Sequence, residues 1–139
     1  MPAHDTCPAL AWLLDDRRFT LPVTAVERVL PAIAIHALPD APAAIAGVID
    51  VQGECIPVLD MRRHLRLPAH DIALTDRLLL AATPRRRLAF FVDAVDGVAD
   101  AAGAPATAMH ASDLDSVLSP AQHQALDRAL AAFAARADA

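Results

Sequence analysis

The chain contains few aromatic residues and no long hydrophobic run. Of its 139 residues none is tyrosine, one is tryptophan and four are phenylalanine, although 55% are hydrophobic. We therefore expect a core built from aliphatic side chains. No apolar stretch reaches the roughly 18 residues that a membrane-spanning helix needs, and the N-terminus lacks the basic-then-apolar order of a signal peptide. These absences predict a soluble, cytoplasmic protein without direct membrane insertion.

Cysteine and charge content exclude further classes of protein. Cys7 and Cys55 lie far apart and form no CxxC pair, so we expect two free thiols in a reducing compartment. The formal net charge is -5, which argues against a nucleic-acid partner because such proteins usually present a basic face. Two arginine-rich segments, residues 62–66 and 85–87, are interpreted as solvated surface, with docking of an acidic partner as the alternative.

Residues of catalytic or metal-binding type do not form a known motif. The six histidines make no HxH or HExxH pattern, so we interpret them as scattered surface side chains. Cys55 is interpreted as small core filler. Asp93 and Asp96 are a candidate acid–base pair, but aspartate favours turns, and we assign them as turn caps around Val95. We predict no catalytic site, cofactor or metal, and keep a small metal-dependent enzyme as a rival hypothesis.

The most informative segment is residues 46–60. Two β-rich runs meet at Gln52 and Gly53, where glycine can supply the positive φ of a tight hairpin turn. Asp60 can then cap a helix over Met61–Leu67, with the arginines of that helix pointing mainly outward. This segment contains packing and turn chemistry but no phosphate-cradling glycines and no nucleophile–base pair. It favours a protein that binds over one that reacts.

Other segments predict further strands and short helices. Strands joined in pairs as hairpins are expected over residues 10–14 with 19–23 and residues 77–82 with 88–92. We also predict one helical turn over residues 24–29, with Thr24 as its cap. A short helix is predicted over residues 42–47, with proline at its start and glycine past its end.

The clearest helix is predicted over residues 119–137. Ser119 and Gln122 have the spacing of a capping box, and Pro120 stands at the first helical position. An apolar stripe follows at helical spacing: Leu126, Ala129, Leu130, Phe133 and Ala137. A helix with one such stripe must pack that stripe against another element.

The order of these elements resembles the CheW-like adaptor family of bacterial chemosensory systems. Residues 19–29, 38–50, 56–62 and 90–98 carry the resemblance, and residues 113–120 resemble the family's entry into its last helix. The resemblance implies a mainly β fold of two small SH3-like barrels packed side by side, with a C-terminal helix. We accordingly expect residues 1–9 to be a disordered N-terminus and residues 10–139 to form one domain.

Members of the family join a CheA-type histidine kinase to the cytoplasmic tips of chemoreceptors. The resemblance therefore implies a non-catalytic scaffold in chemotaxis or pilus motility. The residues that match partner-binding positions are Val26, Arg28, Val29, Gln52, Gly53, Val95 and Val98. The four valines match groove-lining positions, but plain core packing explains them equally well.

Two residues depart from the family pattern. The family's hairpin turn commonly reads Asn-Leu-Arg-Gly, whereas this chain has Asp50-Val51-Gln52-Gly53, so Gln52 lacks the cation and its bidentate fork. Arg28 stands where many members carry an acid. These changes suggest a different partner. The alternative hypothesis is a divergent module for assembly or localisation outside the kinase–receptor array.

The chain is also short between Val98 and Ser112. Family members usually have another strand pair there, so we expect one barrel to be incomplete and to leave an open sheet edge. A second copy of the chain, forming a homodimer, or another partner would add a strand at such an edge, unless the long helix covers it.

Overall fold

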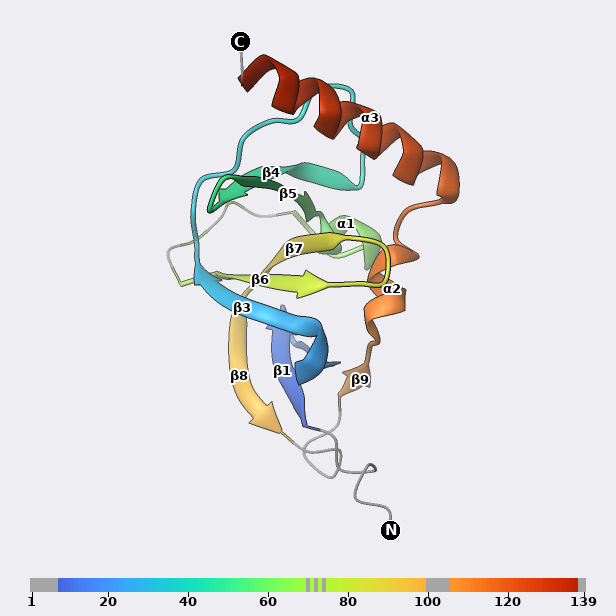
Figure 1. Cartoon of the computed structure of the whole chain (residues 1–139). Helices are drawn as coiled ribbons and strands as arrows, with labels where there is room; N and C mark the ends of the chain where they lie inside the picture. Colours follow the sequence, from blue (N-terminus) through green and yellow to red (C-terminus); the bar gives the residue numbers. More distant parts are fainter. Residues whose placement is uncertain (1–7, 70, 72, 74, 100–105, 138–139) are drawn as a thin grey trace.

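Two β-sheets and a long C-terminal helix make up the computed structural model, which describes residues 8–69, 71, 73, 75–99 and 106–137 (Figure 1). Sheet A consists of β1 (Ala9–Leu14), β2 (Arg17–Pro22), β8 (Ala94–Ala99) and β9 (Thr107–Ala108). Sheet B consists of β3 (Val26–Pro31), β4 (Ile45–Val51), β5 (Glu54–Leu59), β6 (Arg77–Ala82) and β7 (Arg87–Val92). The helices are α1 (Met61–His64), α2 (Ala111–Asp115) and α3 (Pro120–Ala137).

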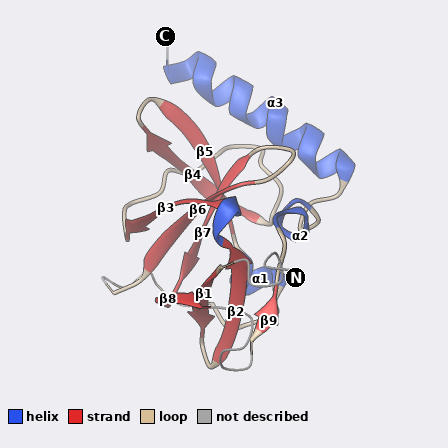
Figure 2. Ribbon diagram, turned by 60° about the horizontal axis from the view of Figure 1, so that its bottom comes forward, coloured by secondary structure: helices blue, strands red, loops and turns tan. Residues whose placement is uncertain are grey.

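The strand order is β8-β1-β2-β9 in sheet A and β3-β6-β7-β5-β4 in sheet B. The predicted hairpins are present, since β1 pairs with β2, β4 with β5 and β6 with β7, each antiparallel. The mainly β architecture with two β subdomains and a C-terminal helix is therefore confirmed (Figure 2).

Sheet A is the smaller of the two sheets. Its strand β9 has two residues and pairs in parallel with β2, placing Thr107 opposite Phe19 and Ala108 opposite Thr20. At the other side of the sheet, β8 pairs with β1. The reduced β9 agrees with the expectation of one incomplete barrel. Residues 100–105, in the short segment between Val98 and Ser112, lie outside the described residues.

One hydrophobic core joins both sheets, and its centre is aromatic rather than aliphatic. The Trp12 side chain is fully buried and stacks on Phe19, with ring centroids 4.5 Å apart. It also meets Phe90 of sheet B at a centroid distance of 5.1 Å. The expectation of a wholly aliphatic core was wrong at this place, because the few large rings fill the space where the sheets meet.

A second, purely aliphatic cluster lies on the other face of sheet B. It is formed by buried residues of its strands: Ile49, Val51, Ile56, Val58, Leu78, Leu80 and Ala89. Half-buried side chains pack along its margin, among them Ile33, Ile35 and Phe91. Strands β5, β6 and β7 of sheet B are thus buried on both faces and read as nearly continuous apolar runs, whereas the edge strand β3 is mostly exposed.

Helix α3 lies over the β4–β5 side of sheet B (Figure 1). Its predicted capping box is present: Ser119 N donates to Gln122 Oε1 at 2.8 Å, and Gln122 N donates to Ser119 Oγ at 3.1 Å. Leu126 and Ala129 are buried, as expected from the apolar stripe. Since α3 lies on this side, the alternative in which the long helix covers the open edge of sheet A was wrong.

His123 of α3 is buried, with 2% of its surface exposed, so its interpretation as a surface histidine was wrong. Its Nε2 lies 2.8 Å from the carbonyl oxygen of Asp115 and ties α3 to the end of α2. The sequence did not predict α2, whose Asp115 also accepts a hydrogen bond from Thr83 Oγ1 at 2.6 Å.

The prediction of a helical turn over residues 24–29 was wrong. A 3-10 turn over Val23–Ala25 comes first, and β3 begins at Val26. Val29 pairs with Leu79 of β6, so β-branched residues extend a sheet here. The pairing of β3 with β6 therefore outweighs the tendency of Thr24 to cap a helix.

The short helix predicted over residues 42–47 was also wrong. A turn closes with Ile45 N donating to Pro42 O at 2.9 Å, and β4 begins at once. Gly47 allows the backbone of His36 to approach β4, because a Cβ at this position would lie 2.4 Å from the His36 carbonyl oxygen. Gly47 therefore permits the close approach of another backbone segment and does not end a helix.

Residues 1–7, most of the segment expected to be disordered, lie outside the described residues, and Ala9 is the first residue of β1. The helix after Asp60 is shorter than predicted. Arg63 N donates to Asp60 Oδ1 at 3.0 Å, which confirms the cap, but α1 ends at His64.

Replacing Trp12 tests whether the aromatic centre holds the two sheets together. Trp12→Ala should lower the free energy of unfolding by about 3–5 kcal/mol, as for other buried aromatic truncations. Trp12→Phe should cost less, because Trp12 Nε1 is buried without a hydrogen-bond partner and its removal relieves that orphan donor. Urea denaturation measures both values.

Val98→Ala is the matched control, since Val98 is 64% exposed and its truncation should change stability by less than about 0.5 kcal/mol. Equal losses for Trp12→Ala and Val98→Ala would contradict the role assigned to the aromatic centre.

Candidate partner-binding surface

The first candidate surface lies along two sheet edges. In the described part of the chain β3 pairs with β6 and β8 pairs with β1, so each forms one edge of its sheet. Both edge strands lie on the same side of the molecule in Figures 1 and 2. Val29 on β3 is 40% exposed and Val98 on β8 is 64% exposed, and these are the exposed large hydrophobic residues of the described chain.

The four predicted groove valines fall into two groups. Val26 and Val95 are half-buried and pack against the main core, whereas Val29 and Val98 face solvent. Val26 and Val95 therefore anchor their strands to the core, whereas Val29 and Val98 are available for contact with a partner. We name Val29 and Val98 together the edge patch.

The second candidate surface is the β4–β5 turn. Gln52 and Gly53 have φ values of 53° and 87°, as a tight turn with two left-handed residues requires. Gly53 N donates to Asp50 Oδ1 at 2.9 Å, which closes the turn. Gln52 and Gly53 are exposed at the tip. β4 and β3 are opposite edges of sheet B, so the turn and the edge patch are separate surfaces.

An arginine from another strand supplies a cation next to this turn. Arg87, at the start of β7, pairs with Glu54 at the start of β5 and with Glu27 of β3, the latter through Nε at 2.6 Å from Oε1. The hydrogen bond to Glu27 raises the pKa of the Arg87 guanidinium. The Glu27–Arg87–Glu54 bridge thus connects the base of the turn to the strand that carries Arg28 and Val29.

The arginine run at residues 85–87 is therefore not simply solvated. Arg86 Nη2 pairs with Asp127 of α3 at 2.7 Å and Arg87 forms the bridge, while Arg85 is exposed. The sequence did not predict the ion pairs of Arg87, because Glu27 and Glu54 lie 60 and 33 positions away from it. Only the strand register brings them together.

Arg62 forms a second ion-pair network, at the junction of the sheets. Its side chain is 12% exposed and binds Asp93 Oδ1 at 2.7 Å and Asp15 Oδ1 at 2.9 Å. It also donates to the carbonyl oxygen of Pro68 at 3.0 Å. Burial alone would lower the pKa of Arg62, but the hydrogen bonds with Asp93 and Asp15 outweigh burial and raise it. The expectation that Arg62 points outward was wrong.

The described contacts of Asp93 and Asp96 join distant segments instead of capping a turn around Val95. Asp93 binds Arg62 and accepts a hydrogen bond from the backbone N–H of Asp15 at 2.7 Å, in the turn between β1 and β2. Asp96 pairs with Arg18 at 3.3 Å. Both carboxylates therefore connect β8 and its entry to distant segments, which corrects the sequence interpretation.

The described residues contain no group of three or more histidine, cysteine, aspartate or glutamate side chains that could hold a metal ion. Cys55 is a free, half-buried thiol, and Cys7 lies outside the described residues. In the same part of the chain, no helix has the length and apolar content needed to span a membrane.

Comparison with known proteins identifies the family. A model of the CheW-like domain matches residues 9–121, which include strands of both sheets and both candidate surfaces. The chain belongs to the CheW-like domain family. The crystal structure of the scaffolding protein TtCheW from Thermoanaerobacter tengcongensis shares its fold, with a TM-score of 0.64 and 22% identity over 68% of this chain and 65% of that one.

Curated relatives carry the same family name. The chain is 26% identical to the chemotaxis protein CheW of Rhizobium meliloti and 25% identical to the probable chemotaxis protein CheW of Rhizobium etli, each over 89 residues. The chemotaxis protein CheW of Bacillus subtilis is also 25% identical over 89 residues. Each match covers 64% of this chain and 57% of the relative, so the chain matches little more than half the length of these proteins.

Replacing Arg62 tests the junction network. Arg62→Met removes the cation that Asp93 and Asp15 share and should lower the free energy of unfolding by about 1–3 kcal/mol. Arg63→Met is the matched control, because Arg63 is the exposed neighbour on the same helix and its loss should cost less than about 0.5 kcal/mol. Thermal and urea unfolding of the two variants give the comparison, and equal effects would contradict the network's role.

Proposed function

We propose that this chain is a non-catalytic adaptor that couples a CheA-type histidine kinase to the cytoplasmic tips of chemoreceptors. Membership of the CheW-like family supports this function, as do the printed names of the relatives, which are chemotaxis proteins. The observation that carries the proposal is the edge patch, an exposed apolar pair on the edges of two sheets that one core holds together.

The edge patch is assigned to the receptor. An apolar pair on otherwise polar strand edges suits a helix that lays its apolar face across them, and a few buried anchors usually supply most of the binding free energy. Arg28, exposed beside Val29, lies at the rim of this patch and sets its charge. Val26 and Val95 hold the two strands in place from the core side.

The β4–β5 turn is assigned to the kinase. Its exposed residues are Gln52 and Gly53, and the nearby cation is Arg87, which two glutamates already bind. A turn with a neutral tip has weaker attraction for an acidic partner than one with a free arginine. This observation favours the alternative function, a module for assembly or localisation outside the array, which the binding experiments below distinguish.

Charge insertion in the edge patch tests the receptor assignment. Val98→Asp should weaken binding of a receptor-tip fragment at least tenfold, because a carboxylate would be desolvated in an apolar contact. Binding of the CheA-type kinase should stay unchanged. Ala132→Asp, an exposed substitution on α3, is the control and should change neither affinity. Isothermal titration calorimetry with purified partners measures all four values.

Receptor binding that is unaffected by Val98→Asp would contradict the assignment of the patch. A folded wild-type chain that binds neither the kinase nor the receptor would contradict the adaptor function and leave the assembly module as the better account.

We further propose that the β8 edge mediates a homodimer. In the described part of the chain β8 pairs with β1 only, and Val98 at this edge is the most exposed of the large hydrophobic residues. An open, apolar edge strand is a template for strand addition by a second copy. Because the receptor patch includes Val98, receptor and second copy would compete for the same edge.

Light scattering after size exclusion tests the dimer. The wild type should show a mass that rises towards twice 14.7 kDa with concentration, and Val98→Asp should remain monomeric. Addition of a receptor-tip fragment should dissociate the dimer. A monomeric wild type at all concentrations would remove the dimer without affecting the adaptor assignment.

A further inference from the structure

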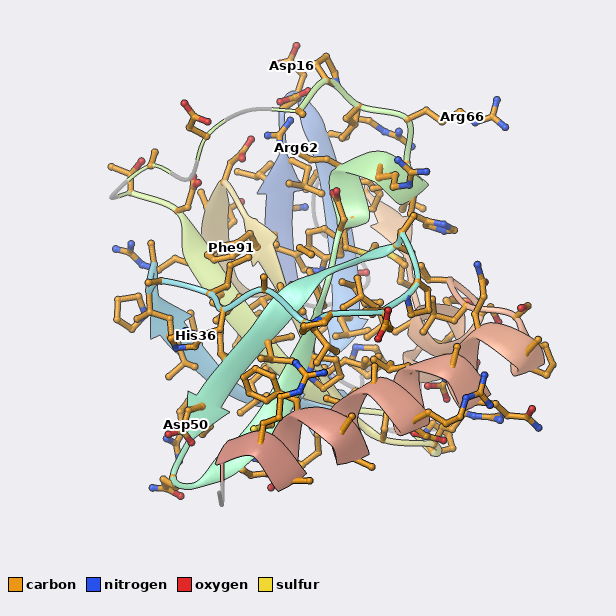
Figure 3. All side chains as sticks on the ribbon, turned by 90° about the horizontal axis from the view of Figure 1, so that it is seen from above. Asp16, His36, Asp50, Arg62, Arg66 and Phe91 are labelled. Carbon is orange, nitrogen blue, oxygen red and sulfur yellow. The ribbon has the colours of Figure 1, made fainter. Side chains whose placement is uncertain are left out.

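A cavity of about 380 Å³ lies at the junction of the two sheets, and its lining includes no residue of the edge patch or of the β4–β5 turn tip. Its lining includes apolar side chains, among them Ile35, Ala46, Leu67 and Phe91, and charged side chains, among them Arg62 and Asp76. Figure 3, viewed from above, shows Arg62 toward the end of the molecule away from α3 and Asp50, with Phe91 between Arg62 and His36. The volume of the cavity lies at the lower end of the roughly 300–1,000 Å³ range of small-ligand sites.

Asp76 is the unusual group in this cavity. Only 4% of its surface is exposed, and its carboxylate receives one hydrogen bond, from Ala73 N to Oδ2 at 2.8 Å. The neighbouring Arg77 donates to the backbone carbonyl oxygen of Asp76, not to the carboxylate. Within the described segments no cation forms a salt bridge with Asp76.

A buried carboxylate with one hydrogen bond is under-satisfied. An ionised carboxylate accepts up to about four hydrogen bonds, and its burial without a compensating charge is costly. Arg62 is already engaged by Asp15, Asp93 and the carbonyl oxygen of Pro68 and therefore does not compensate Asp76. The charge requirement of Asp76 points to a cation from outside the chain.

The charged residues that line the cavity also favour a positively charged ligand. The cavity lining contains three acids, Asp60, Asp76 and Asp93, and two arginines, Arg62 and Arg63, of which Arg63 is exposed. Asp15 adds a further carboxylate behind Arg62, at 2.9 Å from its Nη1. The formal charge around the cavity is therefore negative, and the apolar part of the lining suits a hydrocarbon chain.

The head group is better matched by an ammonium than by a guanidinium. Oδ2 of Asp76 already accepts one hydrogen bond from Ala73 N, whereas Oδ1 accepts none within the described residues and is the freer acceptor. A guanidinium binds best through two parallel hydrogen bonds to both carboxylate oxygens, whereas an ammonium is a compact point charge that needs one.

We propose that this cavity binds an alkylammonium group, with the hydrocarbon chain against Phe91 and Ile35 and the ammonium on Asp76. Two sources share this chemistry, a lysine side chain presented by a protein partner and a free aliphatic diamine. The site does not depend on the adaptor function, because its test uses neither kinase nor receptor.

Titrations of the wild-type protein with matched five-carbon probes test the head-group requirement. With ¹⁵N-labelled protein at 150 mM salt, n-pentylammonium should shift the amide signals of Ala46, Arg63 and Phe91 and leave that of Gln122 on α3 unchanged. 1-Pentanol should bind at least fivefold more weakly, and pentanoate should cause no shifts. Equal binding of pentanol and pentylammonium, or shifts outside the cavity, would overturn the proposal.

Two variants of equal charge change test the role of Asp76. Asp76→Asn keeps the bond to Ala73 N but removes the charge, and should weaken pentylammonium binding at least fivefold. Asp40→Asn is the control, because Asp40 is exposed, does not line the cavity and has a positive φ of 67° that asparagine tolerates. Unchanged affinity in Asp76→Asn would overturn the proposal, and if that variant does not fold, the wild-type probe series decides.

Comparison of cadaverine with Nα-acetyl-lysine methylamide assigns the source. Tighter binding of the lysine derivative indicates a partner's lysine, and tighter binding of cadaverine indicates a free diamine. Binding of neither, alongside no binding of pentylammonium, rejects the site altogether.

Discussion

The packing of Trp12 between two sheets is the interaction on which the rest of the structure depends. Its ring stacks on Phe19 in sheet A and contacts Phe90 in sheet B, so one core crosses the boundary between the subdomains. Because the sheets share this core, their edges cannot move independently. The relative position of β3 and β8, and with it that of Val29 and Val98, follows from this contact. The proposed binding by surface shape needs such a fixed relative position of the two edges.

Much of the fold was predictable because its signals are local. Gly53 at a hairpin tip and the Ser119–Gln122 capping box each specify a turn or a helix start within four residues, and both are present. The segments at residues 24–29 and 42–47 were misassigned because distant residues decide them. Pairing with β6 makes the first a strand, and the approach of His36 determines the role of Gly47.

The site was less predictable, because its electrostatics depend on strand register. Arg62 and Arg63 are adjacent in the sequence, yet Arg62 binds two carboxylates and Arg63 is exposed. Arg85 and Arg87 differ in the same way, since only Arg87 meets Glu27 and Glu54. A run of like charges therefore says little about which member is solvated. Family resemblance predicted four valines as groove residues, and the structure shows that two of them are half-buried and two are exposed.

We propose that a receptor tip binds across β3 and β8, the edges of two sheets that one core fixes relative to each other. Hydrogen exchange of this chain with and without a receptor-tip fragment tests it most directly. We expect slower exchange in β3 and β8 together on binding, with the exchange of α3 unchanged. Protection confined to one sheet, or located on α3, would contradict it.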